Sequence, residues 1–122
     1  MRGVTLLANS KEQIVAEKMK SLLRIGAAST RYKDVFDIYY LIVEDGLEEK
    51  VLRNAFETVI FADPTMREDN MGDIFARLDK VLHDRRFAPN LGNAKNNWLQ
   101  LPTDKVINGI LSYISQFPLL PE

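Results

Sequence analysis

Residues 11–45 read KEQIVAEKMKSLLRIGAASTRYKDVFDIYYLIVED, and this stretch decides the fold class. Ser10 followed by Gln13 matches a capping box that opens a helix, and Gly26 is typical of a helix end. Apolar residues recur at three- and four-residue spacing on both sides of that glycine, which is the period of an amphipathic helix. We therefore expect one helix over 11–25 and a second from about 30 to 45, capped by Ser29 or Thr30.

The rest of the chain continues the helical pattern. Spacing of apolar residues predicts helices over 47–62, 73–83 and 103–117, and a short helix over 94–99 that follows a turn region at 87–92. A short strand over 4–8 is the one non-helical element that we expect. The prediction is an all-α bundle of about five helices, with residues 11–122 as a helical domain and 1–10 as a remnant of a preceding domain or a linker.

Composition limits the function classes. The chain has 122 residues, of which 46% are hydrophobic and 27% charged, so it can bury a core as one domain. The chain has 16 Lys and Arg and 17 Asp and Glu, so its net charge is close to zero. A general nucleic-acid coat protein or a membrane-surface module would be strongly basic, and the charge balance argues against both classes. The chain has no cysteine and one histidine, so thiol chemistry and Cys/His metal sites are excluded. We expect a soluble cytoplasmic domain without a membrane span.

Charge is unevenly distributed along the chain. Residues 11–33 hold six basic and two acidic residues, whereas 34–82 hold five basic and twelve acidic ones. This asymmetry fits either complementary helix faces or an anion site.

Lys18 and two aspartates break the helical pattern. On a wheel of 11–25, Lys18 falls inside the apolar arc, where it either snorkels to water or points into a cleft that binds phosphate. Asp34 and Asp37 share the narrow polar face of the second helix, and they repel each other unless a cation lies between them. Lys33 could pair with Asp37 at the surface; alternatively, one aspartate fixes a catalytic Lys or Arg, or receives a proton. We interpret Trp98 as an anchor for the last helices.

Two motifs give a resemblance. AEKMKSL at 16–22 is similar to the A-E-K-[LM]-K-x-L segment of the AbiEii/AbiGii-type nucleotidyltransferase toxins of bacteria. KDVFDIY at 33–39 is similar to their R-D-x-x-D-[LI]-Y segment, in the same order and at the expected distance. Lys33 replaces the usual arginine, which keeps the charge and loses the bidentate fork.

The resemblance implies a two-part parent protein. Its N-terminal nucleotidyltransferase domain carries a Gly-Ser motif and an Asp-x-Asp metal pair, which this chain lacks. The chain is therefore expected to be the C-terminal helical domain, inactive alone, with no metal or cofactor of its own. The parent would use magnesium with a nucleoside triphosphate, a tRNA acceptor and a cognate antitoxin. The family motifs imply catalytic roles for Lys18, Asp34 and Asp37, and substrate binding by Lys18 and Lys33.

Two other functions fit the same residues. The first is a stand-alone helical module that binds a partner protein, and the second is an RNA-binding domain centred on the basic segment 11–33. An apolar patch left by the absent domain would also favour self-association.

Overall fold

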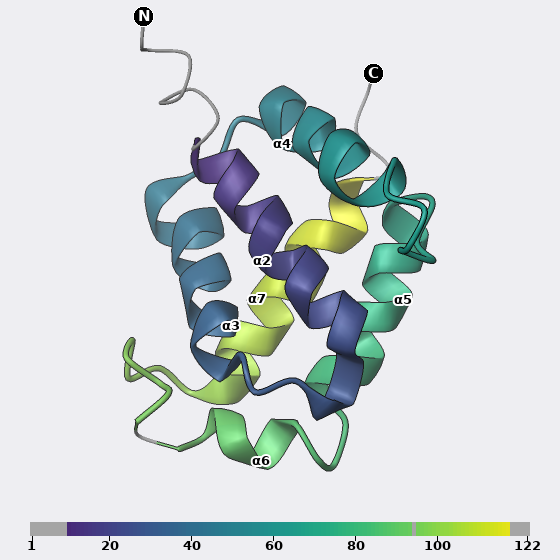
Figure 1. Ribbon diagram of the computed structural model, residues 1–122. Coiled ribbons are helices and arrows are strands. Elements are labelled where there is room, and N and C mark those ends of the chain that lie inside the picture. Colours follow the sequence, from purple (N-terminus) through teal and green to yellow (C-terminus); the bar gives the residue numbers. More distant parts are fainter. Residues whose placement is uncertain (1–9, 94, 118–122) are drawn as a thin grey trace, which may run out of the picture.

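The computed structural model describes residues 10–93 and 95–117, and within them all regular secondary structure is helical (Figure 1). The predicted all-α bundle is confirmed, whereas the expected strand over 4–8 lies outside the described residues. The α-helices of the described ranges are α2 (Lys11–Ile25), α3 (Tyr32–Tyr39), α4 (Glu49–Phe56), α5 (Met71–Leu82), α6 (Ala88–Leu91) and α7 (Thr103–Gln116).

Helix α2 begins and ends as its sequence predicts. The Ser10 hydroxyl accepts a hydrogen bond from the backbone N–H of Gln13 at 3.1 Å, which satisfies one of the free amides of the first turn. Gly26 ends the helix with a φ of 74°, a conformation that glycine adopts without strain. Because both ends are fixed, the register of α2 is set, and with it the direction of Lys18.

The start of α3 differs from the prediction. A 3₁₀ turn (Gly26–Ala28) continues from α2, and the residue before α3 is Arg31, which has no side-chain cap. The Ser29 hydroxyl accepts from the backbone N–H of Arg31 at 3.1 Å, so it fixes the turn before the helix and does not cap the helix. Thr30 is not the cap either. Because the turn fixed by Ser29 precedes the helix, α3 starts at Tyr32, and Arg31 stands directly before its first residue.

Helices α3 and α4 each end in a wider turn. A π-helical segment follows α3 at Tyr40–Asp45, and another follows α4 at Glu57–Phe61. Together with α3 and α4 these segments span 32–45 and 49–61, which is most of the expected ranges 30–45 and 47–62. Helix α5 starts two residues earlier than expected because the Asn70 side chain accepts from the N–H of Asp73 at 2.9 Å.

The short helix lies earlier in the chain than predicted. It forms at Ala88–Leu91, inside the expected turn region, and no residue of 95–99 is helical. Pro89 stands in the first turn, where its missing N–H costs nothing. The following residues are rich in asparagine, whose side chains bond to nearby backbone groups and so compete with a helix. Among them, the Asn97 amide donates to the carbonyl of Leu101 at 2.7 Å.

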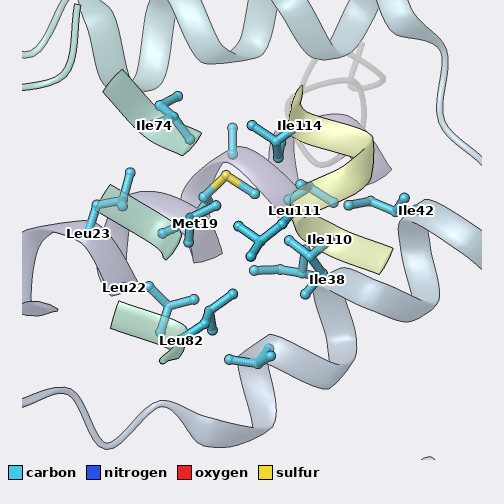
Figure 2. Packing of buried hydrophobic residues seen from close by; sticks show 14 of the residues in the cluster. Met19, Leu22, Leu23, Ile38, Ile42, Ile74, Leu82, Ile110, Leu111 and Ile114 are labelled. Atoms are coloured by element: carbon cyan, nitrogen blue, oxygen red, sulfur yellow. The ribbon is translucent and has the colours of Figure 1, made fainter. Parts of the chain in front are cut away.

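One core joins the helices around α2. Met19 is fully buried and lies near the middle of the cluster in Figure 2, with Ile38 from α3, Ile74 from α5 and Leu111 from α7 around it. Burying a side chain of this size contributes about 1.5–3 kcal/mol. Helix α2 contacts α3, α4 and α5, and α7 contacts α3 and α5 (Figure 1). The face of α2 that carries Lys18 is thereby held against α3.

The buried face of α2 is narrower than the apolar arc that the helical wheel predicts. Val15 and Leu22 are buried, whereas Ile14 is 36% exposed and Ile25 is 51% exposed. Lys18 therefore lies at the border of the buried face and not within it. Within residues 10–93 and 95–117, no helix has the length and hydropathy needed to cross a bilayer.

Candidate functional site

The site is a charged cluster between α2 and α3. The Lys18 ammonium, from the middle of α2, lies 2.9 Å from Oδ1 of Asp34 and 3.2 Å from Oδ2 of Asp37. The two aspartates are three residues apart on α3, so their carboxylates are neighbours on one helix face. Lys18 of α2 thus supplies the positive charge that offsets the repulsion between Asp34 and Asp37. The structure brings together the three residues singled out by the sequence motifs.

Lys18 is strongly held and still reachable. Its side chain keeps 27% of its exposure, while that of Asp34 keeps 12%. Burial lowers the pKa of Lys18, but hydrogen bonds and charge attraction from Asp34 and Asp37 outweigh burial, and the pKa is raised above its ordinary value. Lys18 is therefore a fixed positive charge at any physiological pH. An ammonium has three N–H donors, and two of them serve the aspartates.

Arg31 completes the environment of Asp34. Its guanidinium lies 3.3 Å from Oδ2 of Asp34, one turn earlier on the same side of α3. Asp34 thus pairs one oxygen with Lys18 and the other with Arg31. The spacing of Arg31 and Asp34 by three residues is visible in the sequence, but the expected cap at Ser29 or Thr30 left Arg31 without a role. A guanidinium is therefore present at the site, although Lys33 replaces the arginine of the family motif.

Trp98 holds the other aspartate from a distant part of the chain. Its indole N–H donates to Oδ1 of Asp37 at 2.8 Å, and its ring lies 5.7 Å from that of Tyr40. Trp98, which the sequence suggested as an anchor for the last helices, is 48% exposed and makes this contact without burial in the core. Leu99 and Leu101 pack against the core at this place instead. Sequence reasoning could not find the Trp98–Asp37 contact, because no spacing rule links residues so far apart.

Lys33 stands apart from the cluster. It is exposed on α3, and the surface pair with Asp37 does not form; the cation paired with Asp37 is Lys18 from α2. The structure thus leaves the Lys33 ammonium in solvent on the same helix as the two aspartates.

The carboxylates of the site do not fit a metal ion. Lys18, Arg31 and Trp98 provide a donor to each oxygen of Asp34 and Asp37. Across the part of the chain that the structure describes, no three His, Asp or Glu side chains gather in a way that could bind a metal. The arrangement suits a positioned cation that can meet an anionic group, with aspartates that hold it.

A second lysine on α2, Lys20, also forms an ion pair and serves as a comparison for Lys18. Lys20 lies 2.6 Å from Asp63, which also accepts from the Thr65 hydroxyl at 2.6 Å. The lysines at positions 18 and 20 belong to one helix and have similar exposure, but their carboxylate partners come from different segments. Substitution of Lys20 therefore shows what the loss of a lysine–carboxylate ion pair on α2 does by itself, and substitution of Lys18 shows what is specific to the site.

Comparison with known proteins identifies the family. No curated protein matches the chain, and no solved structure matches it. A family model described as nucleotidyl transferase AbiEii toxin of a type IV toxin–antitoxin system matches residues 2–104, which is most of the chain and includes the whole Lys18 cluster. The chain therefore belongs to the AbiEii nucleotidyl transferase toxin family.

Proposed function

We propose that this chain is the C-terminal helical domain of an AbiEii toxin and forms one wall of the cleft in which a nucleotide is transferred to an acceptor. Membership of the family gives the chain a role in a toxin, and a type IV toxin–antitoxin system implies an antitoxin as partner. The observation that carries the finer proposal is the position of Lys18, which is paired with two aspartates while its side chain stays 27% exposed.

Lys18 is the residue that meets the nucleotide in this proposal. In nucleotidyl transfer, an acceptor hydroxyl attacks the α-phosphorus of a nucleoside triphosphate, and pyrophosphate leaves. Negative charge builds on the leaving phosphates, and a fixed cation stabilises it best when it needs no reorganisation. The remaining N–H donor of Lys18 serves this purpose. Asp34 orients Lys18 or the acceptor hydroxyl, and Asp37 supports the lysine from the other side.

The other partners follow from this assignment. The magnesium that accompanies the triphosphate is assigned to carboxylates of a preceding nucleotidyltransferase domain, because Asp34 and Asp37 are already paired. The acceptor is a tRNA end in the cytoplasm, and exposed Lys33 binds its backbone phosphate. A point charge such as an ammonium suits that contact.

A transfer assay tests the proposal. Labelled nucleoside triphosphate, magnesium and tRNA are incubated with the 122-residue chain alone and with the toxin that contains both domains. We expect labelled tRNA only with both domains present. Lys18→Ala in the two-domain toxin should lower the transfer rate about a hundredfold or more, which is the usual loss when one charge-stabilising donor is removed.

The matched control is Lys20→Ala, which removes a lysine from the same helix and breaks its pair with Asp63. It should transfer at nearly the wild-type rate. Equal loss in both variants would assign Lys18 to stability only. Transfer by the isolated chain would contradict the placement of the metal site in another domain.

A further inference from the structure

Two large aromatic side chains lie open to solvent beside the Lys18 cluster. Trp98 is 48% exposed and Tyr40 is 40% exposed, and their ring centres are 5.7 Å apart with an interplanar angle of 51°. Trp98 comes from the loop before α7, and Tyr40 from the turn that follows α3. Residues far apart in the sequence thus form one aromatic surface.

The loop that carries Trp98 is held without burying the tryptophan. Leu99 and Leu101 pack against the core on either side of Gln100, and the Asn97 side chain bonds to the backbone of Leu101 in both directions, at 2.7 and 3.4 Å. Gln100 has a φ of 56°, which a residue with a side chain adopts only at a cost. The smaller leucines anchor this strained loop, and the largest side chain is left outside.

Asp37 ties the aromatic surface to the cation. One of its oxygens accepts from the Trp98 indole at 2.8 Å, and the other faces Lys18 at 3.2 Å. The indole and the ammonium are therefore separated by the width of one carboxylate group. The hydrogen bond engages the edge of the indole and fixes the direction of its ring.

We propose that Trp98 and Tyr40 form a stacking platform for an unpaired nucleobase. The inference rests on the proposed function, because it places the base next to the lysine assigned to the phosphates. A flat aromatic face binds any base by stacking, and a nearby cation binds phosphate, so the pair of features suits a nucleotide. The base can belong to a free nucleoside triphosphate or to the single-stranded end of an RNA, and both present the same chemistry.

The observations favour a base over a protein surface. The aromatic pair is bordered by the carboxylate of Asp37 and, through it, by the ammonium of Lys18, and interface cores are depleted of charged residues. Stacking on an exposed tryptophan needs only one ring face, whereas a stable protein interface needs a much larger apolar area. Docking of a protein domain on Trp98 is therefore the competing outcome of the test.

Trp98 is the only tryptophan of the chain, so its fluorescence reports on this place alone. The 122-residue chain is titrated to millimolar concentrations with magnesium nucleoside triphosphates, with a short single-stranded oligoribonucleotide and with inorganic tripolyphosphate. We expect saturable quenching by the nucleotide, the RNA or both, which identifies the source of the base, and none by tripolyphosphate. Absence of quenching by every base-containing ligand would overturn the proposal. So would equal quenching by tripolyphosphate, or a response only to an added nucleotidyltransferase domain.

Calorimetric titrations of variants separate stacking from positioning. Trp98→Leu keeps an apolar side chain without a ring and should weaken binding of the base-containing ligand about tenfold. Trp98→Phe keeps a ring and loses the indole N–H, and it should retain most of the affinity. Val51→Ala, at another exposed apolar residue on α4, should bind as the wild type does. Wild-type affinity in Trp98→Leu would contradict the platform.

The outcome does not depend on the transfer assay. If Lys18→Ala transfers normally while bases still quench Trp98, the proposed role of Lys18 fails and the platform stands. If Lys18→Ala stops transfer while Trp98→Leu binds and transfers normally, the platform fails and the role of Lys18 stands.

Discussion

The ammonium of Lys18 lies 2.9 Å from Asp34 and 3.2 Å from Asp37, so a single cation holds two carboxylates that are neighbours on one helix. The contact joins α2 to α3 and removes the repulsion between the aspartates. It also fixes the lysine in place before any ligand arrives. The stability of the fold and the proposed phosphate contact thus depend on the same three side chains. Variants of these residues therefore need a measurement of the free energy of unfolding beside the transfer rate.

Lys18→Met should destabilise the chain. The change leaves Asp34, whose side chain is 12% exposed, with only the longer contact to Arg31, and loss of a hydrogen bond to a charged group costs about 1.5–3 kcal/mol. The free energy of unfolding from urea titrations measures the effect. Lys50→Met, at an exposed position of α4, is the control and should change stability by less than about 0.5 kcal/mol.

Asp34→Asn should cost more stability than Asp37→Asn. Asp34 has the more buried side chain, at 12% exposure against 33%, and it carries two cationic partners, whereas Asp37 has one cation and the Trp98 indole. We expect a difference of about 1 kcal/mol in the free energy of unfolding. A larger loss in Asp37→Asn would show that the exposed half of the cluster dominates.

The chain should lose stability in alkali. Burial, with the charges of Glu49 and Glu12, raises the pKa of Tyr113 to about 12, so the folded state keeps a proton that the unfolded state loses near pH 10. The raised pKa of Lys18 acts in the same direction, because its stabilising charge is fully present below the unfolded pKa and is lost as pH rises through the folded one. Stability should fall from about pH 10 upward.

Tyr113→Phe separates the two groups. The Tyr113 hydroxyl is buried without a hydrogen-bond partner in the described part of the chain, so its removal should leave stability unchanged or raise it by up to about 1 kcal/mol at neutral pH. The variant should lose only part of the alkaline decline. Combining it with Lys18→Met should flatten the curve further, and an unchanged decline in the double variant would contradict both assignments.

Lys20→Gln should raise the pKa of Asp63. Hydrogen bonds from Lys20 and from Thr65 hold the pKa of Asp63 well below its usual range. The stability that the carboxylate contributes is present above the ordinary Asp pKa, and it is lost as pH falls through the lowered folded value. An NMR titration of Asp63 measures the shift. Lys18→Gln serves as control and should leave the Asp63 titration in place, since Lys18 pairs with other carboxylates.

Local signals predicted the helices well. Ser10, Gln13 and Gly26 mark the ends of α2 because capping and a left-handed glycine are decided by adjacent residues. The predicted cap of α3 at Ser29 or Thr30 is wrong, because the Ser29 hydroxyl accepts from the Arg31 amide in a turn for which the sequence has no clear signal. The short helix was misplaced for a similar reason, since Asn97 stabilises a loop where the apolar spacing predicted helix.

The sequence by itself determined the all-α class, the register of α2 and the presence of one lysine and two aspartates with the spacing of a family motif. Only the tertiary structure decided which groups these residues meet. Lys18, not Lys33, is the cation between Asp34 and Asp37, because packing of α2 on α3 aligns their faces. Trp98 joins the same cluster from the other end of the chain. Helix periodicity is a local property of the backbone, whereas the partner of a charged side chain depends on how the buried apolar faces pack together.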